Sequence, residues 1–311
     1  MTRATRRILL VIGVLVAVLA VLAARWFSGH NQVADESFDV SVPHPTYTSK
    51  HPRLVIDEAH HNFHTADGRY RPFAALLSND GYSVTPNTVK FSSGNLQEAD
   101  ILVIANAMGA SMPVLPGASD PAFTPEEADA VRDWVRSGGS LLLVADHEPM
   151  GEANTVLADR FGINMTAGRT YDDPNSDWTS GNPGWLIFSR DNRLLADHPI
   201  TVGRDSSERL TRVQSFGGQS LVGPPGSSPL LMLGKTARNR LPGGADASAE
   251  GQLQALAMQY GSGRVVVFGE GAMLTAMLTA NGSRKMGMNW PNNDNRQLVL
   301  NIMHWLSGAM E

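Results

Sequence analysis

The stretch Arg53-Leu54-Val55-Ile56-Asp57-Glu58-Ala59-His60-His61-Asn62-Phe63-His64 indicates how the rest of the chain folds. Its first part, residues 54–56, is a short apolar run rich in β-branched side chains, which is typical of a buried strand. The run stops at Asp57, and the next residues include a second acid, three histidines and an asparagine. In an open α/β sheet, ligands bind outside the carboxyl ends of the strands. The stretch therefore predicts a strand that carries polar side chains to a binding site.

A structural role is the alternative for each of these polar side chains taken singly. One or two of them can cap the following helix or hold a loop without taking part in any chemistry. Three histidines and two acids exceed what the capping of a single helix requires. The cluster as a whole therefore favours a functional site.

The pattern of apolar residues predicts an α/β domain. Further buried strands are expected at residues 82–84, 100–105, 141–145 and 264–269, and helices at 69–79, 125–137, 152–161 and 293–306. Strands and helices that alternate in this way are typical of a doubly wound, mostly parallel sheet with helices on both faces. Short strands are also expected at 212–216, 230–233 and 253–260, without a position in the sheet.

The amino-terminal segment 8–24 predicts a membrane anchor. It contains no charged residue, it is apolar but for one glycine, and Trp26 and Phe27 follow it as interfacial residues. This length is within the range of about 17–25 residues that spans a bilayer. Three arginines precede the segment, so the positive-inside rule predicts a cytoplasmic amino terminus and an exported remainder. A cleaved signal peptide is the alternative, with residues 21–23 as its cleavage site.

The expected organisation is an anchor at 1–27, a linker rich in small and polar residues at 28–50, and one α/β domain at 51–311. The expected location is the cell membrane, single-pass, with the domain extracytoplasmic or periplasmic. Beyond residue 27 the chain has 21 basic and 30 acidic residues, a net charge of −9, which disfavours nucleic acid as a partner. The absence of cysteine excludes disulfides, thiolate metal sites and a cysteine nucleophile.

Acidic residues follow three of the expected strands: Asp57, Asp146 and Glu270. In a parallel sheet all three lie at one edge, close to the histidines. Carboxylate and imidazole groups from separate strand ends commonly hold a divalent metal, and the same groups can do acid–base work without one. An N-cap role is the alternative, above all for Asp146. The predicted catalytic residues are Asp57, His61, Asp146 and Glu270, and the predicted ligands of a divalent metal are Asp57, His60, His61, His64 and His147.

Substrate binding is predicted for Asn106, Trp178 and Trp185. Asn106 follows an expected strand, so it belongs to the same sheet edge. The two tryptophans lie in the polar segment 168–185, which is too long for an ordinary turn. Aromatic side chains among polar ones suit stacking on sugars, and they equally suit pinning a loop to the core.

Several short motifs, in their order, resemble the class I glutamine amidotransferase-like superfamily. The resemblance is closest to an uncharacterised membrane-anchored branch and to trehalose-utilisation-type domains, and it covers roughly residues 52–308. The motifs are Gly138-Gly139-Ser140, His198-Pro199-Ile200-Thr201-Val202-Gly203, Gly263-Arg264-Val265-Val266, Gly269-Glu270 and Asn301-Ile302-Met303-His304-Trp305-Leu306. The resemblance implies a flavodoxin-like α/β sandwich.

The chain departs from that family at its reactive residues. Asp146-His147 stands where the family has its cysteine nucleophile, and Gly269-Glu270 stands where it has the partner His-x-Glu. The chain is therefore not expected to be a glutamine amidotransferase. Two hypotheses follow. One is a metal-dependent or acid–base hydrolase that acts on a glycan or another cell-envelope component. The other is a non-catalytic ligand-binding or scaffold domain in an envelope complex.

Overall fold

The computed structural model describes residues 32–279 and 282–310. The expected anchor, residues 1–27, lies outside these described residues. Within them, no helix combines the length and the apolar content that crossing a membrane requires.

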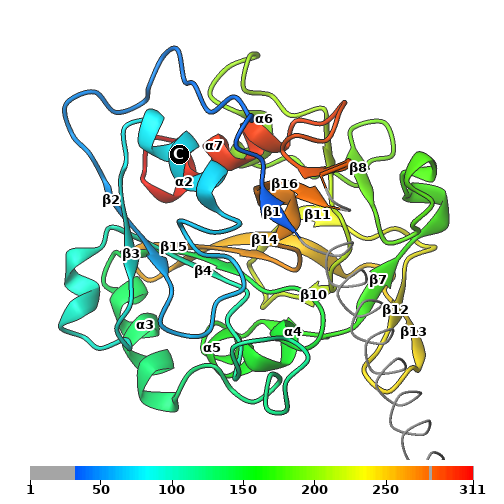
Figure 1. Cartoon of the computed structure of the whole chain (residues 1–311), viewed down its shortest axis with the longest axis horizontal. Coiled ribbons are helices and arrows are strands. Elements are labelled where there is room, and N and C mark those ends of the chain that lie inside the picture. The colour runs from blue at the N-terminus through cyan, green and yellow to red at the C-terminus, as the bar shows by residue number, and fades with distance from the viewer. Residues whose placement is uncertain (1–31, 280–281, 311) are drawn as a thin grey trace, which may run out of the picture.

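A nine-stranded sheet runs through the middle of the molecule (Figure 1). Its strands are β2 (Arg53–Asp57), β3 (Ser83–Asn87), β4 (Ile101–Ala105), β5 (Ser140–Val144), β6 (Asn164–Met165), β10 (Leu221–Val222), β11 (Ser228–Met232), β14 (Leu253–Tyr260) and β15 (Gly263–Phe268). Five strands, in the order β3-β2-β4-β5-β15, are parallel. Beyond β15 the sheet continues antiparallel through β14, with β10 and β11 beside β14 and β6 beside β10. The expected parallel sheet is thus confirmed in its central part.

Helices cover both faces of this sheet. They are α2 (Arg71–Asn79) and α7 (Asn295–Leu306) on one face, and α3 (Pro125–Arg136) and α5 (Thr155–Asp159) on the other. Alternate residues of each parallel strand point to opposite faces. Accordingly Val103 belongs to one apolar cluster with Phe73 of α2 and Leu298 of α7, whereas Leu102 belongs to a second cluster with Val131 of α3. Burial on both faces explains why the inner strands β4, β5 and β15 are nearly continuous apolar runs, whereas β3 at the sheet edge is not.

Smaller elements are attached to this core. The remaining strands are β1 (Val33–Ala34), β7 (Arg169–Tyr171), β8 (Ile187–Ser189), β9 (Arg212–Gln214), β12 (Arg238–Arg240), β13 (Asp246–Ser248), β16 (Ala276–Thr279) and β17 (Arg284–Gly287). They form the sheets β1-β16-β17, β13-β12-β7 and β8-β9. The short helices are α4 (Met150–Ala153), α6 (Pro199–Val202), η1 (Asn95–Glu98), η2 (Asp173–Asn175), η3 (Trp178–Ser180) and η4 (Ala272–Leu274).

Residues 32–50, which belong to the expected linker, lie against the domain. Strand β1 pairs with β16, and the backbone N–H of Thr46 donates to Oδ1 of Asp80 at 2.8 Å. The buried carboxylate of Asp80 also contacts Nε2 of His304 in α7 at 2.7 Å. Phe38 and Tyr47 pack on the main apolar cluster. This segment is therefore a strap on the domain and not a free tether, because its polar and apolar groups both have partners there.

Candidate functional site

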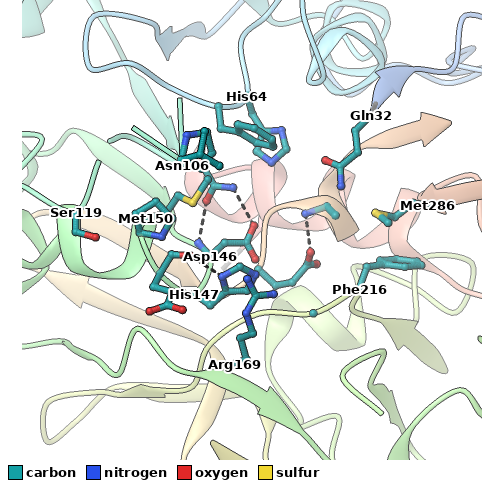
Figure 2. Close-up of a pocket in the computed structure, with 18 residues that line it drawn as sticks. Gln32, His64, Asn106, Ser119, Asp146, His147, Met150, Arg169, Phe216 and Met286 are labelled. Atoms are coloured by element: carbon teal, nitrogen blue, oxygen red, sulfur yellow. Dashed lines mark hydrogen bonds between the residues drawn. The ribbon is translucent and has the colours of Figure 1, made fainter. Parts of the chain in front are cut away.

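A cavity of about 500 Å³ lies at the carboxyl edge of the parallel strands. This size is within the usual range for small-molecule sites. Figure 2 shows Asn106, Asp146, His147, His64 and Arg169 around it.

The strands explain how these side chains meet. Asn106 directly follows β4, Asp146 follows β5 after one alanine, and Glu270 follows β15 after one glycine. Because β4, β5 and β15 are neighbours and parallel, their carboxyl ends lie side by side. His64 comes from the loop after β2, and Arg169 comes from β7.

Asn106 fixes the position of Asp146. The Asn106 amide donates to Oδ2 of Asp146 at 2.8 Å, and Oδ1 of Asn106 accepts the Asp146 backbone N–H at 2.8 Å. The backbone N–H of Gly271 also donates to Oδ2 at 3.2 Å. Asn106 has a left-handed backbone with φ of +54°, a conformation that asparagine tolerates better than most residues. No hydrogen bond within the described residues reaches the other carboxyl oxygen of Asp146, so it is available to a ligand.

Glu270 is almost fully buried at 1% exposure. Its two oxygens accept the backbone N–H groups of Ala272 and Met273, each at 2.8 Å, at the start of η4. Burial and the nearby charge of Asp146 raise the pKa of Glu270 well above its ordinary value of 4.5, against the opposing effect of these backbone N–H groups.

Asp146 is shifted in the same direction. Burial raises its pKa above the ordinary 3.8, and the charge of His147, the Asn106 hydrogen bond, the Gly271 N–H and the charge of Arg169 oppose this rise. Two close carboxyl groups cannot both ionise freely, so they titrate as one unit. The pair therefore keeps a proton to a higher pH than separate acids do.

His147 presents one ring nitrogen to the cavity. Its Nδ1 lies 2.7 Å from the carbonyl oxygen of Glu148, which can only accept, so Nδ1 carries the proton. In the neutral ring Nε2 is then unprotonated and able to accept a proton. His147 is half-buried at the cavity wall.

His64 is a neutral wall of the cavity. Its ring stacks on Tyr70 with 4.7 Å between centroids, and burial, with a smaller effect of the Arg69 charge, lowers the pKa of His64 to about 3. Gly271 makes this packing possible, because a Cβ there would lie 2.9 Å from Nε2 of His64. His64 is therefore uncharged at neutral pH.

Asp57 and His60 form a separate, closed network. Nδ1 of His60 lies 2.8 Å from Oδ2 of Asp57, and Nε2 lies 3.0 Å from Oε1 of Glu127. The His60 ring lies between Phe91 and Phe123, with centroids 4.7 and 4.5 Å away. Both side chains are buried, and neither lines the cavity.

The structure thus divides the predicted site residues. His64, Asn106, Asp146, His147 and Glu270 share the cavity. The exposed His61 and the 85% exposed Trp178 do not line it.

Trp185, predicted to bind substrate, is buried in the core. It is 3% exposed and packs edge-on against two other rings. Its ring centroid lies 4.8 Å from that of Phe216 and 5.1 Å from that of Trp290. It therefore supports Phe216, which does line the cavity.

The predicted metal ligands are not gathered into one centre. Asp57 and His60 bind each other, whereas His64 and His147 line the cavity. In the part of the chain that the structure describes, no group of three or more His, Asp or Glu side chains is arranged to hold a metal ion.

Arg169 and Phe216 line the cavity and were not predicted. Arg169 lies at the start of the polar segment 168–185, so its position in a long loop was an available signal. Phe216 precedes two glycines, Gly217 and Gly218, and this short turn after an expected strand was the only local sign.

No protein-family model and no curated protein matches the chain. Solved structures with a related fold include the mmIFT52 N-terminal domain, with a TM-score of 0.59, 14% identity, and coverage of 82% of this chain and 97% of that chain. Cytoplasmic Protein STM3548 from Salmonella typhimurium has a TM-score of 0.47 and 14% identity, over 82% of this chain and 98% of that chain. A ThuA-like protein from Parabacteroides merdae has a TM-score of 0.45 and 12% identity, over 84% and 91%. The likeness to the mmIFT52 domain supports the α/β fold and nothing beyond it.

Proposed function

We propose that the chain is an acid–base hydrolase domain held at a membrane, with its site in the cavity at the carboxyl edge of the sheet. The observation that carries this proposal is the pair Asp146 and Glu270. These carboxyl groups come from separate strand ends, and the pKa of each is raised beside one cavity. A carboxyl pair that keeps one proton to a higher pH than separate acids do can supply an acid and a base to the same reaction.

In the proposed reaction, water is added across a bond of the substrate. The carboxyl pair gives its proton to the leaving-group oxygen, so that this group departs neutral. Nε2 of His147 takes a proton from the attacking water as the water oxygen bonds to the substrate. After product release this proton returns to the carboxyl pair, which balances the cycle.

A glycan or another envelope component is the proposed substrate class. The apolar segment 8–24 and the arginines before it favour a domain outside the cytoplasm. The Asn106–Asp146 unit and the ring of Phe216 offer the hydrogen bonds and the apolar face that sugars use.

A non-catalytic ligand-binding or scaffold domain in an envelope complex is the second candidate. It is favoured by the contacts of Glu270, whose two oxygens both accept backbone N–H groups. These bonds give Glu270 a structural role as the cap of η4, with no need for chemistry.

The pH dependence of stability tests the carboxyl pair. A carboxyl group whose folded pKa is raised destabilises the folded protein as pH rises from its ordinary value of 4.5 toward the folded value. In Asp146→Asn the charge is gone while an amide oxygen can keep the bonds from Asn106 and Gly271. The pKa of Glu270 should therefore fall, and the unfolding free energy should decline less with pH, by about 1.4 kcal/mol per unit of pKa change. Urea unfolding of the full chain in detergent, between pH 4 and 9, measures this.

The exposed Asp173→Asn is the matched control and should behave like the parent. Turnover is measured with para-nitrophenyl glycosides, and Asp146→Asn should lower it by about 100-fold or more. If Asp146→Asn leaves the pH dependence unchanged, the carboxyl pair does not exist. If the pair titrates as expected and a glycoside binds without being cleaved, the binding-domain candidate replaces the hydrolase.

A further inference from the structure

A second cavity adjoins the first one. It has a volume of about 390 Å³, and the two cavities share the residues His147, Arg169, Phe216 and Gly217. Its other walls include Tyr171 and residues 182–184. A ligand that occupies both cavities must therefore pass directly beside Arg169.

Arg169 makes no salt bridge among the described residues, and its charge acts only through space, on Asp146. Among the described residues, no carboxylate and no hydrogen-bond acceptor contacts its guanidinium, which is exposed at the junction of the two cavities. Arg240, the other arginine of the second cavity, differs, because its Nε donates to Oδ1 of Asp246 at 2.6 Å. Figure 2 shows the Arg169 side chain reaching toward His147 and Asp146.

The pairing of β7 with β12 places these two arginines directly opposite each other. Arg169 in β7 is the direct cross-strand partner of Arg240 in β12. Like charges in this position are destabilising. Asp246 neutralises Arg240, so the remaining positive charge is that of Arg169. An anion bound at Arg169 would remove the mismatch.

We infer that the ligand of this site carries an anionic group, a carboxylate or a phosphate, which pairs with Arg169 while the ligand extends across both cavities. The guanidinium matches either group through two parallel N–H bonds. The inference rests on the proposed function for the position of the site, and it names the substrate class more closely as an anionic glycan unit. Arg169 is then a binding residue, and it also orients the ligand toward Asp146 and His147.

Three probes that share one ring and one aglycone test this inference. They are para-nitrophenyl β-glucoside, its uronic acid, and its 6-phosphate. Calorimetric titration of the full-length protein should give affinities for at least one anionic probe about tenfold higher than for the neutral glucoside, because charge-assisted bonds are roughly twice as strong as neutral ones. The anionic probe that binds more tightly distinguishes a carboxylate from a phosphate.

Substitution then assigns the preference to Arg169. Arg169→Gln should remove the preference, so that the anionic probes bind no more tightly than the neutral glucoside, while Arg169→Lys should keep part of it. Arg209→Gln is the matched control, since Arg209 is exposed, lines neither cavity and has no partner among the described residues.

Equal affinity for the three probes, failure to bind any of them, or a preference that survives in Arg169→Gln would overturn the inference. The two proposals fail separately. An anionic preference without hydrolysis supports the inference and contradicts the hydrolase. Hydrolysis of the neutral glucoside without any anionic preference supports the hydrolase and contradicts the inference.

Discussion

His60 and His147 both follow strands of the central sheet, yet their ring nitrogens have different surroundings. Both nitrogens of His60 face carboxylate oxygens of the protein, so nothing is left for a ligand. His147 uses only Nδ1, on a backbone carbonyl, and leaves Nε2 at the cavity. Both are histidines three residues after the end of a strand. Whether a ring nitrogen is free for a ligand therefore depends on which neighbouring group contacts the ring.

At the residue scale, the structure predicts that Asp57→Asn destabilises the fold. Oδ2 of Asp57 accepts from His60 and Asn62, and Oδ1 accepts from Asn87 and from the backbone N–H of Ala59. An asparagine amide would turn two hydrogen atoms toward donors in a buried site. The unfolding free energy should fall by about 1–3 kcal/mol, the usual cost of an unsatisfied buried group. Urea unfolding of the full chain measures this.

The exposed Asp67→Asn serves as the control, because it changes the same charge in the same loop. If Asp57→Asn is as stable as the Asp67→Asn control, then Asp57 is not a structural group, and its predicted role as a catalytic or metal-binding residue regains weight.

The acids at the strand ends could be predicted from sequence, because an acid at or within two residues of the end of a buried strand needs only local information. Asp146 and Glu270 follow this rule and share a cavity. Asp57 follows the same rule and lies elsewhere, since Asn62 and Glu127 decide where its network closes. The contact of His60 with Glu127 joins residues 67 positions apart in the sequence, so no local pattern contains it.

At the scale of elements, α3 shows how a local signal gains a long-range function. Its sequence Thr124-Pro125-Glu126-Glu127 predicts a capped start, and the structure has the full capping box. The Glu127 carboxylate also accepts from the backbone N–H of Phe91 and contacts His60. The helix start is thereby tied to the loop after β2.

We predict that Glu127→Gln weakens this tie. Burial opposes ionisation of Glu127, but the Thr124 N–H and His60 outweigh it and lower its pKa below the ordinary 4.5. A lowered pKa stabilises the fold above that value, and this stability is lost as pH falls. The unfolding free energy at pH 7 should drop by about 1–2 kcal/mol, and the difference from the parent should shrink below about pH 4.

Glu126→Gln, one residue earlier on the exposed side of the same helix turn, is the control. A loss of equal size in Glu126→Gln would show that the effect comes from the helix dipole alone and not from His60.

The antiparallel strands were predicted only as separate pieces. The segment 253–260 is β14, and it joins the sheet beside β15 through a tight turn at Gly261. Strands β10 and β6 contain two residues each, too short for any periodic pattern. Their positions depend on pairing with distant strands, which explains why the sequence did not indicate them.

At the scale of the whole molecule, the cavity lies where parallel and antiparallel parts meet. Asp146 and Glu270 come from the parallel strands, and Arg169 and Phe216 come from segments inserted between β6 and β10. The sequence indicated the first group through alternating strands and helices. The second group depends on how the inserted segments fold back, which no local signal describes.

The proposed topology makes a prediction for the intact chain. In right-side-out membrane vesicles from a bacterial host, added protease should digest the domain, because three arginines flank only the leading end of the apolar segment. In inverted vesicles the domain should be protected. Protection in right-side-out vesicles and digestion in inverted ones would place the domain in the cytoplasm. Release of the intact domain without protease would indicate cleavage.

Gln32 lines the cavity, and β1 fixes the chain there against β16. Gln32 lies eight residue-to-residue steps from Ala24, the end of the apolar segment, a reach of at most about 29 Å when fully extended. If that segment is anchored in a bilayer, the cavity is tethered within a thin layer next to the membrane surface. Its search for substrate is then confined almost to two dimensions, and molecules fixed in that layer meet the site at a raised effective concentration, whereas freely diffusing ones gain nothing.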